Sequence, residues 1–161
     1  MRIVIKIGTS TLTHSNGNMN IRHVERLCCV ISDLKNAGHD VIMVSSGAIG
    51  MGVGRLSLRE RPKDMPTKQA AAAVGQIRLA HYYQEVLAER GLKVAQVLLT
   101  LDDSEDRERY LNARNTLDTL LDLGVIPVIN ENDTVATGEI KVGDNDRLGA
   151  RVAQMVSADA L

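Results

Sequence analysis

The sequence predicts an α/β fold built around a mainly parallel sheet, and two observations support this prediction. Short apolar runs rich in Val and Ile alternate with longer stretches in which apolar residues recur at helical spacing, a pattern typical of βαβ units. The 161 residues fit one domain that can bury a core. With 3 Tyr and no Phe or Trp, that core must consist of aliphatic side chains and Met.

The first half of the chain begins with two expected strands separated by a helix. Asn20 is placed to cap the start of this helix, and Gly38 is placed to stop it. The expected elements are a strand at 2–7, a helix between Asn20 and Gly38, a strand at 40–44, a glycine-rich turn at 45–54 and an exposed, charged loop at 56–66.

The second half repeats the alternation. Its expected elements are an Ala-rich helix at 67–90, a strand at 92–99, an acidic loop at 102–106, a helix at 106–122, a strand from 125, a small hairpin at 135–142 that turns at Gly138, and a helix at 147–156. Residues 158–161 resemble the start of another buried strand. A cut there would leave a sheet position empty, so we expect a fragment of a longer polypeptide.

Composition argues against several classes of protein. A net charge of -1, from 19 basic and 20 acidic residues, gives no positive field for nucleic acid. Neither a signal peptide nor a membrane span is evident, so a cytoplasmic location is expected. Cys28 and Cys29 are adjacent and lack zinc-site spacing, and no metal constellation is evident. The histidines are interpreted as surface or boundary residues: His14, His23, His39 and His81.

Polar and glycine-rich segments follow the expected strands, and parallel strands bind ligands beyond their carboxyl ends. These segments are residues 8–10, 45–48, 100–102 and 130–133. The last is the most informative, because Asn130-Glu-Asn-Asp133 and Asp144-Asn-Asp146 flank one short excursion. Asn and Asp also favour turns for local reasons, and either motif alone would be read as a decorated loop. Together they favour a ligand site.

The first two strand ends suit an anion. Lys6 lies one residue before the end of its strand and precedes Gly8, Thr9 and Ser10, whose amides and hydroxyls could bind phosphate. The alternative is a solvent-facing lysine at a sheet edge. Ser46 is followed by glycine-rich backbone at an expected helix start, which can bind a carboxylate or a phosphate, or simply form a tight turn. The spacing matches neither a dinucleotide fingerprint nor a P-loop.

The fourth strand end suits a cation, so a zwitterionic amino acid could span the second and fourth ends. Residues 144–146 lack EF-hand spacing, and any magnesium would be carried by substrate phosphates. The absence of a catalytic histidine constellation fits a carboxylate nucleophile, which has a pKa of about 4.3 and needs no general base. Phosphoryl transfer to it depends mainly on positioning and charge neutralisation.

Five motifs together resemble the glutamate 5-kinases of the amino acid kinase family. They are residues 6–10, 45–50, 106–115, 129–134 and 143–148, and the resemblance covers essentially the whole chain in order. It implies a three-layer αβα sandwich of the carbamate kinase-like type. It also implies transfer of the γ-phosphate of ATP to the side-chain carboxylate of L-glutamate, the first step of proline biosynthesis. Homo-oligomers and feedback inhibition by proline are expected from the same resemblance.

The resemblance also implies roles for individual residues. Lys6 would stabilise the transferring phosphoryl group, with Gly8, Thr9 and Ser10 near the phosphates, and Asp146 would organise the catalytic lysines rather than act as a base. The residues expected to bind glutamate are Ser46, Gly47, Ala48, Asn130, Asp133, Asp144 and Asn145.

The family's adenine and ribose contacts, and a second catalytic lysine, would follow Leu161. Residues 1–161 are therefore expected to form the glutamate-binding part of the kinase domain, without the nucleotide-binding part or any RNA-binding-like C-terminal domain, and with weak or no turnover in isolation. One alternative is a non-catalytic module that binds glutamate or proline. Another is a generic nucleotide-binding α/β domain.

Overall fold

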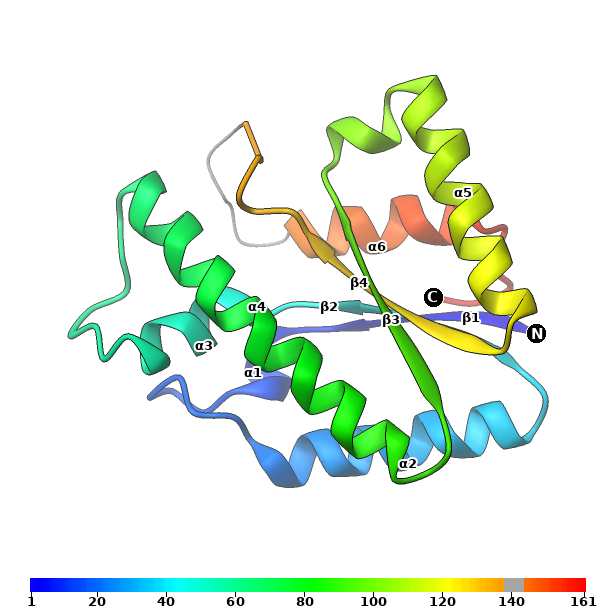
Figure 1. The fold of residues 1–161 in the computed structure, drawn as a ribbon, viewed down its shortest axis with the longest axis horizontal. Coiled ribbons are helices and arrows are strands. Elements are labelled where there is room, and N and C mark those ends of the chain that lie inside the picture. The colour runs from blue at the N-terminus through cyan, green and yellow to red at the C-terminus, as the bar shows by residue number, and fades with distance from the viewer. Residues whose placement is uncertain (138–143) are drawn as a thin grey trace.

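The predicted parallel sheet is confirmed. The computed structural model describes residues 1–137 and 144–161, with the side chain of Asp144 left out. In it four parallel strands lie in the order β1-β2-β4-β3. The strands are β1 (Arg2–Ile7), β2 (Asp40–Ser45), β3 (Lys93–Leu99) and β4 (Val125–Glu131). Because every strand points the same way, all four carboxyl ends lie along one edge of the sheet (Figure 1).

Helices cover both faces of this sheet, as the expected αβα sandwich requires (Figure 1). On one face α2 (Ile21–Asn36) and α4 (Met65–Ala88) pack against the sheet in a core cluster that includes Ile31, Met43 and Leu79. On the other face α5 (Arg107–Asp122) and α6 (Asp144–Met155) form a second cluster. Burial of both sheet faces explains why the central strands β2 and β4 read as continuous apolar runs rather than alternating ones.

Side-chain caps set the starts of three helices. Asn20 accepts from the His23 N–H at 3.3 Å, so the cap predicted for α2 is confirmed. The Asp64 carboxylate accepts from the Thr67 N–H at 2.9 Å, and α4 consequently begins two residues earlier than predicted, with Pro66 in its first turn. Asp106 caps α5 in the same way.

The glycine-rich turn predicted for residues 45–54 is wrong over most of its length. Only Ser46 and Gly47 form the turn, with Gly47 at φ 99°, and α3 (Ala48–Arg55) follows at once. One of its glycines serves a helix contact instead of a turn: a Cβ at Gly52 would overlap the carbonyl of Ala71 on α4. Two further short elements were not predicted: α1 (Thr9–Leu12) follows β1, and the 3₁₀-helix η1 (Asp102–Ser104) lies within the predicted acidic loop.

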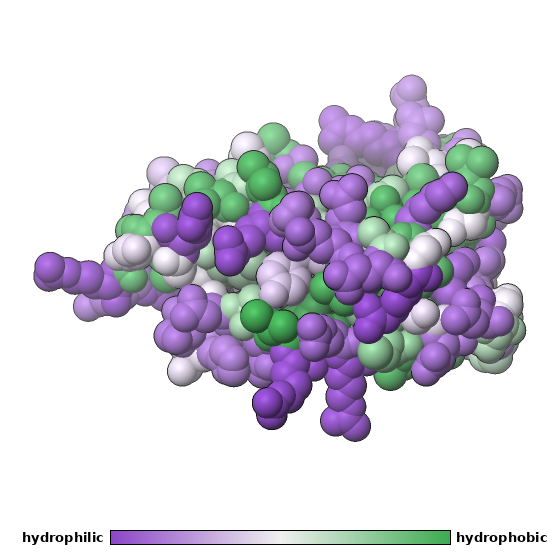
Figure 2. Space-filling view, turned by 60° about the horizontal axis from the view of Figure 1, so that its bottom comes forward, coloured by the Kyte–Doolittle hydropathy of each residue, from purple (hydrophilic) through white to green (hydrophobic). Residues whose placement is uncertain are grey.

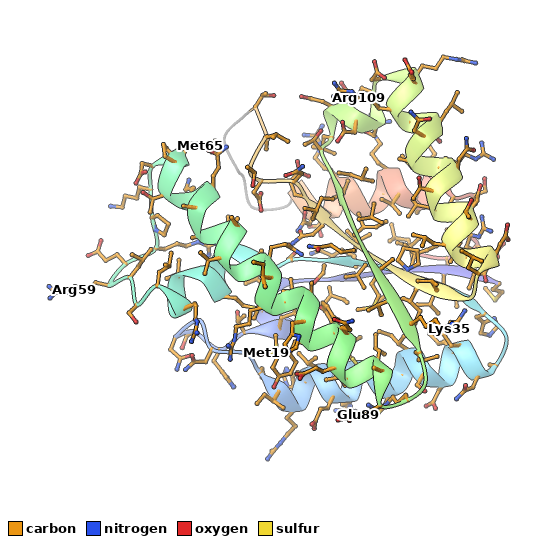
Figure 3. The ribbon with its side chains drawn as sticks, in the orientation of Figure 1. Met19, Lys35, Arg59, Met65, Glu89 and Arg109 are labelled. Atoms are coloured by element: carbon orange, nitrogen blue, oxygen red, sulfur yellow. The ribbon has the colours of Figure 1, made fainter. Side chains whose placement is uncertain are left out.

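Two other predicted segments are the loop before α4 and the small hairpin after β4. The loop before α4 is exposed as expected, and Arg59 lies at its far tip, beyond the start of α4 at Met65 (Figure 3). The small hairpin predicted to turn at Gly138 falls on residues that lie outside the described part of the chain.

The last residues run beside β1, opposite β2. The Val4 N–H donates to the Ala160 carbonyl at 3.0 Å, and Ile3 and Ala160 form a parallel bridge. The predicted strand start is thus confirmed in its pairing, but not in its burial. Asp159, Ala160 and Leu161 are exposed, since no described residue covers this edge.

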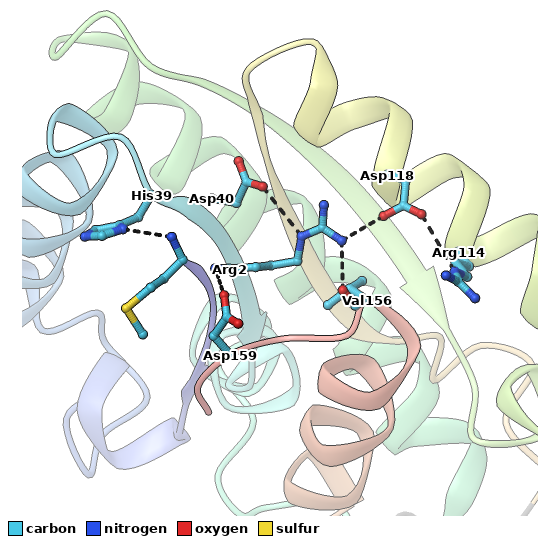
Figure 4. Close-up of polar contacts among 8 residues, drawn as sticks. Arg2, His39, Asp40, Arg114, Asp118, Val156 and Asp159 are labelled. Atoms are coloured by element: carbon cyan, nitrogen blue, oxygen red, sulfur yellow. Dashed lines mark hydrogen bonds and ion pairs between the residues drawn. The ribbon is translucent and has the colours of Figure 1, made fainter.

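Arg2 ties this segment to the amino edge of the sheet (Figure 4). Its guanidinium forms ion pairs with Asp40 at 3.5 Å and Asp118 at 3.0 Å, and donates to the Val156 carbonyl at 2.8 Å. Its backbone N–H donates to the Asp159 carboxylate at 2.6 Å. The amino edge is therefore closed by a structural network, which leaves the opposite, carboxyl edge as the place to look for a ligand site.

The face shown in Figure 2 is largely hydrophilic, with hydrophobic residues in small groups between protruding hydrophilic ones. No helix in the described ranges has both the length and the apolar character needed to cross a bilayer.

Cys28, on the inner side of α2, makes stability depend on alkaline pH. Burial raises its pKa from 9.0 to about 11, so the unfolded chain ionises at a lower pH than the folded one. Below pH 9 the thiol is neutral in both states; between pH 9 and 11 ionisation increasingly favours unfolding. We expect this ionisation to cost about 3 kcal/mol across the window, so the loss of stability measured by urea denaturation should be correspondingly smaller in Cys28→Ala.

The matched variant Cys29→Ala removes the neighbouring exposed thiol and controls for the loss of a sulfur atom. If Cys28→Ala lost stability over the same pH window as steeply as the unaltered chain, the burial of Cys28 would not be the cause.

Candidate functional site

Polar residues of four segments meet at the carboxyl edge of the sheet. The register pairs Ile7 with Ser45 and Val44 with Ile129, which places the ends of β1, β2 and β4 side by side. The first turn of α6 returns to the same place (Figure 1). We call the resulting group the carboxyl-edge cluster, which consists of Lys6, Ser46, Asn130, Asn145 and Asp146.

Asn145 joins the strand ends. Its amide nitrogen donates to the Ser45 carbonyl at 3.0 Å, to the Ser46 hydroxyl at 2.8 Å and to Asn130 Oδ1 at 3.2 Å. Two hydrogens shared among three acceptors hold α6 against β2 and β4 at once. With the nitrogen directed into the protein, the oxygen is the atom of this side chain that a ligand N–H could use.

Lys6 lies next to this junction. Its ammonium nitrogen is 2.5 Å from Asp146 Oδ1, and its side chain is 29% exposed. The aliphatic part of Lys6 passes over Gly149, where an added Cβ would lie 3.6 Å from the lysine Cβ and Cγ. The ammonium has three N–H donors, so donors remain for phosphoryl oxygens while one bonds to Asp146. The structure thus supports a role for Asp146 in orienting Lys6.

Two helix starts add backbone amides. Gly8 precedes α1, and the Lys6 ammonium is 3.6 Å from the position a Gly8 Cβ would occupy. Gly47 precedes α3, for which no described side chain provides a capping hydrogen bond. The positive end of a helix and its first N–H groups suit an anion. The Ser46 N–H is not among them, because it donates to the Ile7 carbonyl at 3.0 Å.

Leu98 at the end of β3 pairs with Asn130 along the sheet, but the polar side chains that follow β3 make no described hydrogen bond to the cluster. Thr100 and Asp103 cap each other, with the Thr100 N–H donating to Asp103 Oδ2 at 2.7 Å. Burial alone would raise the pKa of Asp103, but hydrogen bonds from Thr100 and Arg109 outweigh it and hold the pKa below its ordinary value. Asp102 instead accepts from the Thr137 hydroxyl at 3.1 Å. All four strand ends were expected to offer polar groups to one candidate site, whereas Thr100 and Asp103 at this end bond to each other in a local turn.

The remaining predicted residues lie nearby in sequence or outside the description. Asp133 is half-buried in the turn after β4, while Thr9 is half-buried and Ser10 exposed at the start of α1. Asp144 is the first residue of α6, and its side chain lies outside the described residues.

Sequence reasoning missed two residues of α4 that support the cluster. Gln76 Oε1 accepts from the Asn130 amide nitrogen at 2.7 Å, and the Tyr83 hydroxyl bonds to the Ser45 hydroxyl at 2.9 Å. Tyr83 is 1% exposed, and burial raises its pKa. A signal was present: these two polar residues are seven apart, on the inner face that also carries Leu79, and would be out of place there without partners.

A lysine, two helix starts and an Asn/Asp cluster thus lie at the carboxyl edge of a parallel sheet, which is where α/β proteins bind their ligands. The chain belongs to the amino acid kinase family, whose model matches residues 1–161. This confirms the family and fold expected from the motifs.

Within this family, the chain is similar to several curated glutamate 5-kinases. The chain is 58% identical over 160 residues to a glutamate 5-kinase of Moorella thermoacetica, covering 99% of this chain and 42% of the relative. It is 61% identical over 161 residues to that of Paramagnetospirillum magneticum, covering 99% and 43%. For the glutamate 5-kinase of Clostridium tetani the identity is 56%, covering 99% of this chain and 60% of the relative. The chain thus spans between 42% and 60% of the length of these relatives.

Proposed function

We propose that this chain supplies the acceptor-substrate part of a glutamate 5-kinase, which phosphorylates the side-chain carboxylate of L-glutamate with ATP to give L-glutamyl 5-phosphate. The observation that carries the proposal is the contact of Lys6 with Asp146 beside the Asn145 junction, because it sets a fixed cation next to a site for an amino acid. The names of the relatives support the same activity. In a cell this reaction would be the first step of proline biosynthesis.

Glutamate would lie between the ends of β2 and β4. The Ser46 hydroxyl and the amides of Gly47 and Ala48 suit the γ-carboxylate, since they combine a donor with the positive end of α3. Asp133 would face the ammonium group, together with Asp144 and the oxygen of Asn145, while Asn130 would hold Asn145 in place. Donors at one end and acceptors at the other match a zwitterion.

The reaction needs no general base. A γ-carboxylate oxygen attacks the γ-phosphorus of ATP, the bond from that phosphorus to the β,γ-bridging oxygen breaks, and ADP leaves with the electron pair. The carboxylate is already ionised at neutral pH, so no proton moves. Lys6 would neutralise charge on the transferring phosphoryl oxygens, with Gly8, Thr9 and Ser10 near the phosphates, and Asp146 would hold Lys6 in place.

Magnesium would be carried by the nucleotide. Within the described ranges no group of three His, Cys, Asp or Glu side chains could hold a metal ion, so we assign most of its ligands to the ATP phosphates and water. The chemistry it would supply is neutralisation of the negative charge on the phosphates. Proline, which shares the ammonium and α-carboxylate of glutamate, would compete at the same edge as a feedback inhibitor, and the active form would be a homo-oligomer.

The proposal is tested with the natural gene product in an ADP-release assay with L-glutamate, D-glutamate and L-aspartate. We expect turnover that depends on L-glutamate, and hydroxylamine should trap the acyl phosphate as a hydroxamate. ADP release unaffected by glutamate would favour a generic nucleotide-binding domain. Calorimetric binding of glutamate or proline without any turnover would favour the non-catalytic module.

Asp133→Asn should act chiefly on glutamate binding. The substitution keeps the shape of the side chain and removes its charge, so we expect the KM for L-glutamate to rise about 10- to 100-fold, the effect of losing 1.4 to 3 kcal/mol of interaction with the ammonium, with a smaller change in kcat. Steady-state kinetics at saturating ATP measures both constants.

Asp122→Asn, at the exposed end of α5, is the matched control and should leave both constants unchanged. A fall in kcat at constant KM in Asp133→Asn would remove Asp133 from the ammonium site.

A further inference from the structure

Gln76 on α4 contacts the carboxyl-edge cluster, although it belongs to none of the sequence motifs from which the cluster was predicted. Its Oε1 accepts from the Asn130 amide nitrogen at 2.7 Å, across 54 residues of sequence. Asn130 is 3% exposed, so water cannot readily replace this acceptor. The contact therefore has consequences for how Asn130 is oriented.

An asparagine amide can lie in two orientations that exchange its oxygen and its nitrogen. In the observed one, Asn130 Oδ1 accepts from the Glu131 N–H at 2.8 Å and from Asn145 Nδ2 at 3.2 Å. In the reverse orientation the Asn130 nitrogen would face both donors. Gln76 completes the selection, because it gives the nitrogen an acceptor on the opposite side.

The geometry points to Gln76 as a positioning residue for the glutamate site, an inference that rests on the proposed function. Gln76 fixes the Asn130 amide, Asn130 Oδ1 fixes one hydrogen of Asn145, and Asn145 holds the Ser46 hydroxyl at 2.8 Å. Gln76 itself does not touch substrate in this arrangement. It determines that the oxygen of Asn145 remains for the amino acid.

The position of α4 makes this control rigid. The residue before Gln76 is Gly75, where an added Cβ would overlap the Ala48 carbonyl at the start of α3. Farther along the helix Tyr83 bonds to the Ser45 hydroxyl at 2.9 Å. One face of α4 therefore packs against α3, bonds to the amide of Asn130 and bonds to the end of β2. Gln76 makes the contact that selects the orientation of the Asn130 amide.

Kinetics of the natural gene product test this role. Gln76→Leu removes the acceptor with little change in volume, and we expect the KM for L-glutamate to rise at least about 10-fold, one lost hydrogen bond to a buried amide, while the KM for ATP stays within about 2-fold. Gln76→Glu keeps an acceptor oxygen and should recover most of the glutamate affinity. Gln84→Leu makes the same change at an exposed position of the same helix and should behave as wild type.

A second measurement does not depend on activity. With asparagine side chains labelled by ¹⁵N, the Asn130 and Asn145 NH₂ protons should exchange slowly with solvent in the wild type and in Gln84→Leu, and faster at both residues in Gln76→Leu. The inference is overturned if Asn145 is unaffected, if Gln76→Glu is no better than Gln76→Leu, or if the two KM values rise together. Absence of glutamate turnover in the wild type would instead refute the proposed function, and the exchange data would still decide the role of Gln76.

Discussion

Lys6→Ala should lower the kcat for glutamate phosphorylation by about 10²- to 10³-fold, the cost of removing one preorganised donor from developing charge. The KM for L-glutamate should change far less, because the ammonium is held beside Asp146 and Gly8 rather than between the residues proposed to bind the amino acid. Charge on the phosphoryl oxygens is redistributed in the transition state, so an interaction with them affects kcat more than ground-state binding. Initial rates at saturating ATP and varied glutamate measure the two constants.

Lys93→Ala is the matched control for Lys6→Ala. Lys93 is an exposed strand lysine at the amino end of β3, on the edge opposite the site, and its loss should leave kcat unchanged. Asp146→Asn should fall between the two variants, since it removes the orienting charge and keeps Lys6. A loss of glutamate affinity in Lys6→Ala with unchanged kcat would contradict the role assigned to the lysine.

Gly52→Ala should lower the free energy of unfolding by about 3 kcal/mol, near the upper range for overpacking a close contact. A Cβ at Gly52 would overlap the carbonyl oxygen of Ala71, and this group is helix backbone that cannot rotate away. Relief requires α3 to move off α4. Since α3 begins at Ala48, the same displacement should disturb the proposed carboxylate site. Chemical denaturation followed by circular dichroism gives the stability change.

Gly50→Ala, on the same helix, is the control. An added Cβ there would lie 3.8 Å from Thr9 Cγ2, an ordinary contact, so the variant should be unchanged or more stable by about 0.5–1 kcal/mol through its higher helix propensity. Equal stability of Gly50→Ala and Gly52→Ala would show that the close helix contact does not limit stability.

The sheet and most helices could be predicted because their signals are local. Apolar runs marked the strands, and Asn20 marked the start of α2 by its capping chemistry. The failure at α3 has a tertiary cause. Glycine favours turns by local preference, but here Gly52 is required by the approach of α4, which no local pattern reveals.

The candidate site divides in the same way. The cluster of Asn130, Asn145 and Asp146 followed from strand ends and motifs, and the structure brings these residues together with Lys6. Gln76 escaped prediction because its partner lies 54 residues away and its own helix looks like ordinary Ala-rich core. The polar residues after β3 were predicted to contribute to the site, but Thr100 and Asp103 bond to each other instead, since polar residues after a strand can equally close a local turn.

The central claim is that the ends of β1, β2 and β4 hold L-glutamate with its side-chain carboxylate toward Lys6. A crystal structure of the natural gene product with L-glutamate and a non-hydrolysable ATP analogue tests it most directly. The account predicts the ammonium of glutamate near Asp133 and the oxygen of Asn145, its γ-carboxylate near Ala48, and the Lys6 ammonium between that carboxylate and the γ-phosphate. Glutamate bound away from these strand ends, or Lys6 directed away from the phosphates, would contradict it.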